Sequence, residues 1–281
     1  MTEDIGDIIS KGFDTWKNNL NICLPFVFSM VITSALFLII LGGAVFVTIP
    51  SLVPFFSNPS EIEPGPILDL LPKIFQSMGI IITAAIIAII LSLFVNAFFT
   101  SGAIGMAKEA TKSGKTDITD MKEYGTKKFI SLFSSNIIIG LITFAGVIFL
   151  IPGILYILPN LSSFPNLPPD DVLIAAIPLL GLGFLAMGIY VIIISLMFFP
   201  SQFAIVIDDL GAIQGVKKGF RFFMDHKIDA FLLFIIMGAV MMVPGLFGSI
   251  PHVGGILSLA ISVIVIQPLV IIWWSRLYLS T

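Results

Sequence analysis

Residues 80–100 read IIITAAIIAIILSLFVNAFFT, and residues 101–128 read SGAIGMAKEATKSGKTDITDMKEYGTKK. The first stretch has no charged side chain, and its length is that of a helix that crosses the hydrocarbon core of a bilayer. The second stretch contains six lysines and four acidic residues. The same alternation of uncharged runs and charged connections continues along the chain, and it predicts an integral membrane protein with several spans.

The composition of the whole chain supports this interpretation. Of its 281 residues, 57% are hydrophobic and 11% are charged, whereas a soluble domain has about 25% charged residues. The net charge of −3 argues against a nucleic-acid partner, because such proteins carry a clustered basic face. With one cysteine, Cys23, and two histidines, His226 and His252, the chain offers no zinc or iron–sulfur constellation, so we expect no metal and no cofactor.

Six uncharged runs are long enough to be transmembrane helices. They cover residues 22–49, 74–100, 130–158, 172–199, 230–250 and 254–278. The last two form one run, which residues 244–251 divide with two prolines and two glycines. That composition favours a tight hairpin over one continuous helix.

The basic residues lie on alternate connections between these spans. Thirteen of the 14 lie at the two termini or in the second and fourth connections: Lys11, Lys17, Lys108, Lys112, Lys115, Lys122, Lys127, Lys128, Lys217, Lys218, Arg221, Lys227 and Arg276. Lys73 alone lies on the other side. Because lysine and arginine accumulate in cytoplasmic loops, we expect a multi-pass protein of the cell (plasma) membrane with both termini in the cytoplasm.

Short amphipathic segments precede the odd-numbered spans. Lys11-Gly12-Phe13-x-x-Trp16 ahead of the first span matches Lys218-Gly219-Phe220-x-x-Phe223 ahead of the fifth. A weaker copy, Gly125-x-x-x-Phe129, precedes the third span. In each copy, apolar residues at helical spacing oppose charged ones, which is typical of a helix in the membrane interface.

A proline lies at or near the outer end of each odd-numbered span, at Pro50, Pro152 and Pro244. Together with the amphipathic segments, this marker predicts an internal repeat. We therefore expect an all-α fold in which residues 1–281 form one integral membrane domain, with parallel repeat units at about 1–110, 116–209 and 210–281. Each unit would be a cytoplasmic interfacial helix followed by a transmembrane hairpin, so the repeats are parallel and not inverted.

None of the span interiors contains an ionisable side chain. Such groups usually mark ion pathways and proton relays in membranes, so their absence argues against a proton-coupled pump, a voltage sensor or an intramembrane protease. The candidate polar residues within the spans are Ser92, Asn96, Asn136, Gln202 and Gln267. They suit either packing between helices or the lining of a polar cavity, and the two glutamines could satisfy carbonyls freed by neighbouring prolines.

Charged and aromatic residues gather at the inner ends of the spans. Asp208 and Asp209 end the fourth span and Arg276 ends the sixth, so we expect an ion pair between them, with a cation or substrate gate as the alternative. Trp273, Trp274 and Tyr278 are interpreted as an interfacial aromatic belt. A second candidate site comprises Lys217, Lys218 and Arg221, which suit anionic lipid headgroups, although enforcement of topology explains them equally well.

Residues 199–220 read FPSQFAIVIDDLGAIQGVKKGF. They place an acid at the inner end of span four, ahead of a basic amphipathic helix rich in small residues. Together with the Pro-Gly breaks, these features resemble a prokaryotic set of six-span proteins, most of which are uncharacterised. That set includes the membrane domain attached to some glycerophosphodiester phosphodiesterases. The resemblance implies the fold and topology but no activity, because the chemistry of those relatives belongs to a separate soluble domain. The excess of isoleucine, and of lysine over arginine, is typical of archaeal or low-GC sources.

The sequence therefore predicts a non-enzymatic membrane protein that binds lipid or a protein partner through its amphipathic collar, with a homo-oligomer as a further possibility. The alternative is a transporter or channel for a neutral or lipid-like solute. A continuous polar cavity near Asn96 and Asn136 would favour transport. A solid apolar centre would favour a scaffold or lipid-binding role.

Overall fold

A computed structural model describes residues 3–50, 71–161, 170–251 and 253–280. Throughout these ranges the regular structure is helical. The elements are α1 (Ile5–Asn18), η1 (Leu20–Cys23), α2 (Leu24–Phe37), η2 (Leu38–Gly42), α3 (Gly43–Thr48), α6 (Leu71–Ser113), α7 (Ile118–Phe144), η5 (Ala145–Leu150), α8 (Ile151–Leu161), α9 (Asp170–Phe198), α10 (Ser201–Ile207), α11 (Ala212–Asp225), α12 (Lys227–Gly248), α13 (Gly254–Ile261), η6 (Ser262–Ile266) and α14 (Gln267–Leu279).

Six of the helical segments are long and apolar enough to cross a membrane, which confirms the predicted number of spans. They are Leu20–Thr48, Phe75–Ser113, Ile118–Leu158, Ala176–Ile207, Lys227–Gly248 and Gly254–Leu279. The first and third connections between the predicted spans lie mostly outside the described residues.

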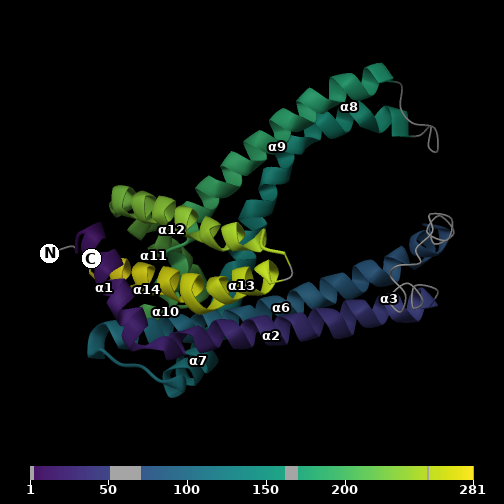
Figure 1. The fold of residues 1–281 in the computed structure, drawn as a ribbon. Coiled ribbons are helices and arrows are strands. Elements are labelled where there is room, and N and C mark those ends of the chain that lie inside the picture. Colours follow the sequence, from purple (N-terminus) through teal and green to yellow (C-terminus); the bar gives the residue numbers. More distant parts are fainter. Residues whose placement is uncertain (1–2, 51–70, 162–169, 252, 281) are drawn as a thin grey trace.

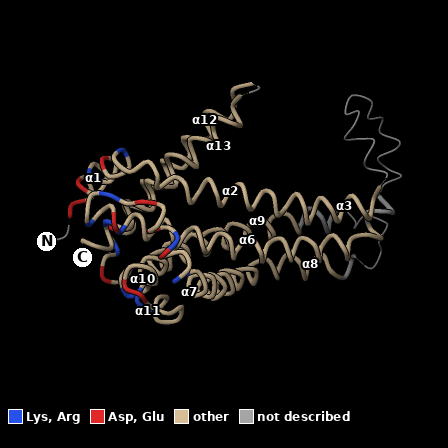
Figure 2. The backbone as a smooth tube through the Cα atoms, turned by 90° about the horizontal axis from the view of Figure 1, so that it is seen from below, with Lys and Arg blue, Asp and Glu red and all other residues tan. Residues whose placement is uncertain are grey.

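The helices converge at one end of the molecule and diverge at the other (Figure 1). Both chain termini lie at the convergent end, and the lysine, arginine, aspartate and glutamate residues gather there as well (Figure 2). We call this end, formed by α1, α11, the α6–α7 turn and the last turns of α14, the charged end. The hairpins α2–α6 and α8–α9 extend away from it as two arms, whereas the α12–α13 hairpin is shorter (Figure 1). The exposed area of 16095 Å², against roughly 12,000 Å² for a compact protein of this size, agrees with that open shape.

The core of the molecule is built on α10 and α14. Ten of the 13 residues of α14 and six of the seven residues of α10 are buried. The fully buried Trp274 ring lies 4.8 Å from the Phe199 ring and 6.2 Å from the Phe203 ring. The predicted aromatic belt at Trp273, Trp274 and Tyr278 is therefore wrong, because these side chains are inside the protein and do not face lipid.

Helix α1 covers α14 from the outside. The indole nitrogen of Trp273 donates a hydrogen bond to the Ile9 carbonyl at 3.2 Å. A Cβ placed on Gly12 would lie 2.3 Å from the same indole, so only a glycine permits this approach. Ile8, a residue of α1, is fully buried. Part of the apolar stripe that the sequence assigned to the membrane interface thus contacts protein.

The second predicted unit begins differently from the other two. Helix α6 has 43 residues, which is about 65 Å of helix against a hydrocarbon core of about 30 Å, and it extends past the predicted span to the turn at Gly114. There φ is +81°, a conformation that favours glycine. Helix α7 then starts at a capping box of Asp117 and Asp120 and runs unbroken to Phe144. A separate interfacial helix ahead of span three was therefore a wrong prediction.

The three proline markers adopt three different conformations. Pro50 lies just beyond the end of α3, Pro152 is the second residue of α8 after a 3₁₀ segment, and Pro244 is inside α12. The hairpin expected over residues 244–251 therefore starts only after Gly248, because a helix in a membrane protein can continue past a proline when the freed carbonyl is satisfied elsewhere. The three-fold repeat stays a prediction.

Candidate functional site: an uncharged cavity and an ion-paired end

A cavity of about 960 Å³ lies between α2, α6 and the α12–α14 segment. We call it the main cavity. Its polar lining is Ser29, Thr33 and Ser34 from α2, Asn96 and Thr100 from α6, Gln202 from α10, and Ser258, Ser262 and Gln267 from α13, η6 and α14. Its apolar lining includes Phe26, Phe99, Phe199 and Met241. No lysine, arginine, aspartate or glutamate is among these lining residues.

The structure brings three of the five predicted polar residues together at this cavity. Asn96, Gln202 and Gln267 come from three different helices and all line it. Asn136 lines a smaller chamber that also contains Gln202. Ser92 donates its hydroxyl to the Ala88 carbonyl of its own helix at 2.7 Å, which supports the packing interpretation for that residue.

A π-helical segment forms part of the cavity wall. Segment η6 contains the lining residues Ser262 and Val263 and directly precedes Gln267 and Pro268. Pro268 cannot donate to the carbonyl four residues earlier, at Ile264, and the Trp16 indole of α1 donates to that carbonyl instead, at 3.0 Å. The sequence offered Gln267 for this task or for the lining of a polar cavity, and the structure places its side chain in the cavity lining.

Aromatic rings separate the main cavity from the charged end. Phe199 lines the cavity, and its ring packs against Trp274 at 4.8 Å and Phe203 at 5.8 Å. Phe203 and Trp274 are fully buried. We call these three residues the aromatic floor, because they fill the space between the cavity and the buried part of α10.

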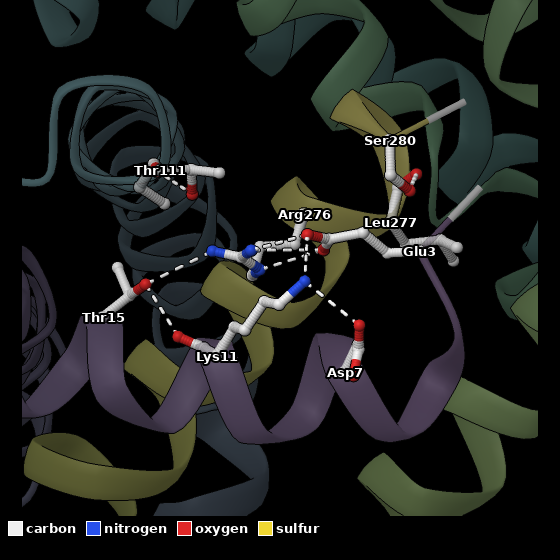
Figure 3. Close-up of polar contacts among 9 residues, drawn as sticks. Glu3, Asp7, Lys11, Thr15, Thr111, Arg276, Leu277 and Ser280 are labelled. Atoms are coloured by element: carbon white, nitrogen blue, oxygen red, sulfur yellow. Dashed lines mark hydrogen bonds and ion pairs between the residues drawn. The ribbon is translucent and has the colours of Figure 1, made fainter. Parts of the chain in front are cut away.

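At the charged end, Arg276 does not pair with the aspartates as predicted. Its guanidinium contacts Glu3 at 2.9 Å and also donates to the Thr15 hydroxyl at 3.4 Å, as Figure 3 shows. Lys11 contacts Glu3 and Asp7, each at 3.1 Å. Partial burial opposes ionisation of Glu3, but hydrogen bonds from Arg276 and Lys11 outweigh it and lower the pKa of this carboxyl. The prediction failed because α1 lies over α14, and the residues just before α1 supply a nearer acid, Glu3.

The partners of Asp208 and Asp209 are lysines and a tyrosine. Asp208 pairs with Lys218 at 2.7 Å and accepts a hydrogen bond from the Tyr278 hydroxyl, so it does join the end of span four to the last helix, although not through Arg276. Asp209 pairs with Lys127 at 3.0 Å and with Lys128. Hydrogen bonds from Lys128 and Lys127 lower the pKa of the Asp209 carboxyl to about 2.

The connection between α10 and α11, which contains both aspartates, is also held by hydrogen bonds to backbone carbonyls. Lys128 is buried and its ammonium group donates to the Leu210 carbonyl at 3.2 Å, while Lys108 donates to the Ile207 carbonyl at 3.1 Å. Carbonyls at the end of a helix carry partial negative charge, so cations stabilise them. These contacts explain both aspartates as structural groups and favour that interpretation over a gate.

The three residues of the predicted lipid-headgroup site do not share one environment. Lys218 is engaged by Asp208, whereas Lys217 and Arg221 are exposed. Helix α11, which carries all three, packs tightly on α10: a Cβ on Gly219 would lie 2.4 Å from the Ser201 Cα, and one on Gly215 would lie 2.1 Å from the Ile205 side chain. Within the described ranges, no group of three His, Cys, Asp or Glu residues could hold a metal ion.

Residues 35–275 match a family model described as a domain of unknown function, DUF7847. The chain belongs to this family. The match extends from α2 into α14 and so includes about half of the first span and all or most of the other five. No curated protein and no solved structure matches the chain significantly. The resemblance to the membrane domain of glycerophosphodiester phosphodiesterases is not shown by these comparisons and stays a prediction.

Sequence reasoning missed part of the lining of the main cavity in this family member. Ser29 and Thr33 on α2, and Ser258 and Ser262 on α13 and η6, are each four residues apart and line the main cavity. Four-residue spacing places side chains on one face of a helix, so the signal was present in the sequence. What the sequence lacked was the helix pairing that turns these two faces toward each other.

Proposed function

We propose that this protein is a non-enzymatic membrane protein that binds a neutral, lipid-like solute in the main cavity in order to transport it. The observation that supports this is the combination of a volume of about 960 Å³ with a mostly apolar lining whose polar side chains are all uncharged. Ligand sites of about 300–1,000 Å³ commonly bury a molecule of drug size. The proposed solute has an apolar part and an uncharged polar group.

The chemistry of the lining supports a neutral solute over an ion. A charged solute would lose its hydration shell on entry and would find no opposite charge in the lining, and unpaired charge in a membrane interior is costly. Serine, threonine, asparagine and glutamine side chains instead offer hydrogen bonds to hydroxyl, amide or ester groups. The phenylalanine and methionine side chains offer contact to an apolar chain.

Binding of anionic lipid by the collar is the second candidate. Lys217 and Arg221 are exposed on α11, and a basic side chain near an anionic membrane surface contributes about 1 kcal/mol. That contribution requires no particular lipid, so we assign it to membrane attachment. The transported solute belongs in the main cavity.

For the orientation, we propose that the charged end faces the cytoplasm of the cell, as the lysine distribution predicts. The gathering of the charged side chains and both termini at one end supports this (Figure 2). In a Cys23→Ser background, a cysteine introduced in place of Lys112 should resist a membrane-impermeant thiol reagent added to intact cells. Labelling from outside would contradict the orientation.

The experiment fills the main cavity without disturbing its walls. Gly245 lines the cavity, and a Cβ added there meets no atom within 4 Å, so Gly245→Leu extends into the cavity alone. Gly238 on the same helix also has open space around it and does not line the cavity, which makes Gly238→Leu the matched control. Each variant is purified from native membranes, and neutral lipids retained per protein are quantified by mass spectrometry.

We expect wild type and Gly238→Leu to retain the same neutral lipid, and Gly245→Leu to retain several-fold less. The thermal midpoints of the two variants should agree, since leucine improves helix propensity equally at both positions. Equal retention in all three proteins would refute the proposed function.

A further inference from the structure

A small polar chamber adjoins the main cavity. It has a volume of about 190 Å³ and lies between α7, α9 and α10, with Ser135, Asn136, Ser195 and Gln202 as its polar lining. Phe199 also lines it. We call it the polar chamber. No charged residue is among its lining residues.

The polar chamber shares lining residues with the two spaces beside it. Phe199 and Gln202 line both this chamber and the main cavity. On its other side, Asn136 and Ile139 line both the chamber and a groove of about 470 Å³ between α7 and α9. Phe199 and Gln202 thus border the main cavity on one side and the chamber on the other.

Ser135 is a buried polar residue in the wall of the polar chamber. Its side chain is 1% exposed, and its hydroxyl has no hydrogen-bond partner among the described residues. Buried hydroxyls nearly always have a partner, from the protein or from an ordered guest molecule. The chamber has room for about six water molecules, and hence for a small polar group.

We infer that the polar chamber binds the hydroxyl-bearing end of the solute whose apolar part occupies the main cavity. This inference rests on the proposed function and specifies its solute as a neutral amphiphile with a small polyol headgroup, such as a glyceride. A hydroxyl group both donates and accepts, as do Ser135, Ser195, Asn136 and Gln202, so several hydroxyls can be satisfied at once. An anionic or cationic headgroup finds no counter-charge there.

The test compares two probes that share one acyl chain. 1-Monooleoylglycerol has two free hydroxyls, and methyl oleate has none. Their affinities are measured by displacement of a fluorescent monoacylglycerol from the full-length protein in detergent. Wild type should bind the glyceride about tenfold more tightly than the ester, since two hydrogen bonds favour it.

Two variants then assign that preference to the polar chamber. Ser135→Ala removes a hydroxyl that has no hydrogen-bond partner among the described residues, so no hydrogen bond of the fold is lost. Asn136→Leu removes the amide at nearly constant size. Each should reduce the preference to within about twofold and leave the affinity for methyl oleate unchanged. Thr143→Val is the control, because Thr143 lines the α7–α9 groove outside the chamber and its hydroxyl bonds within its own helix.

The outcomes separate the two proposals. A glyceride preference that persists in Ser135→Ala and Asn136→Leu, while Gly245→Leu loses both probes, would mean that the polar chamber holds water only; the inference would fail and the proposed function would stand. Absence of binding of either probe to wild type would overturn both proposals.

Discussion

The charged end and the divergent arms are held together by different means. At the charged end, α10 and α14 are almost wholly buried, and ion pairs and lysine–carbonyl contacts connect α1, α7, α11 and α14. In the first arm, Pro25 is the one buried residue of α2, and η2 and α3 have none. The comparison teaches that the protein specifies one end by its own packing and leaves the other to the lipid. The main cavity lies at the boundary between the charged end and the divergent arms.

The largest effect should come from a glycine at the packed end. In Gly219→Leu the new side chain meets the backbone of Ser201 at 2.4 Å, and backbone cannot move aside as a flexible side chain does. We expect a loss of about 3 kcal/mol or more in the free energy of unfolding, seen as a lower thermal midpoint in detergent.

A glycine in the open region gives the contrast. Gly238→Leu faces open space and should raise the midpoint slightly, by up to about 1 kcal/mol of unfolding free energy. If the two glycine variants lost stability equally, the division into a packed end and an open region would be wrong.

A smaller effect is expected at the junction of α1 with the cavity wall. Trp16→Phe leaves the Ile264 carbonyl without the donor that now satisfies it, which should cost about 1–2 kcal/mol. Pro268→Ala supplies a backbone N–H to the same turn. In a double-mutant cycle, Trp16→Phe should therefore cost less in the Pro268→Ala background. Simple additivity of the two changes would show that the indole does not act through this carbonyl.

The smallest expected effect is on the stability of the fold at acid pH. The pKa of Asp209 is about 2 in the folded protein, below its ordinary value of 3.8. Its ion pairs therefore stabilise the fold above about pH 4 and are lost as the pH falls toward about 2. Because the Asp209 side chain is 57% exposed, solvent screens these pairs and the contribution is small.

Asp209→Asn keeps the shape of the side chain and tolerates the positive φ of 59° at this position. The thermal midpoint of wild type should exceed that of the variant above about pH 4, and the difference should shrink toward about pH 2. A difference that is constant over this range would contradict the ion-pair account.

The sequence predicted the helical class and the number of spans because hydrophobic length and charge are local properties. It also found Asn96, Gln202 and Gln267, since polar residues stand out in apolar runs. It failed wherever the outcome depended on which helix packs on which. Arg276 meets Glu3, more than 270 positions away in the chain, and Trp273 and Trp274 resemble an interfacial belt until α1 and α10 cover them. The continuous α7 was missed because the amphipathic segment at Gly125–Phe129 was read as an element separate from the third span.

The contacts of α1 have a consequence for the order in which the chain is assembled. Both indole hydrogen bonds, from Trp16 to the Ile264 carbonyl and from Trp273 to the Ile9 carbonyl, join α1 to the η6–α14 segment, whose residues lie 248 and 264 positions further along the chain. Helix α1 is therefore synthesised long before these partners. Until η6 and α14 are inserted, α1 lacks the contacts that they supply, and deletion of α14 should leave it without a place to dock.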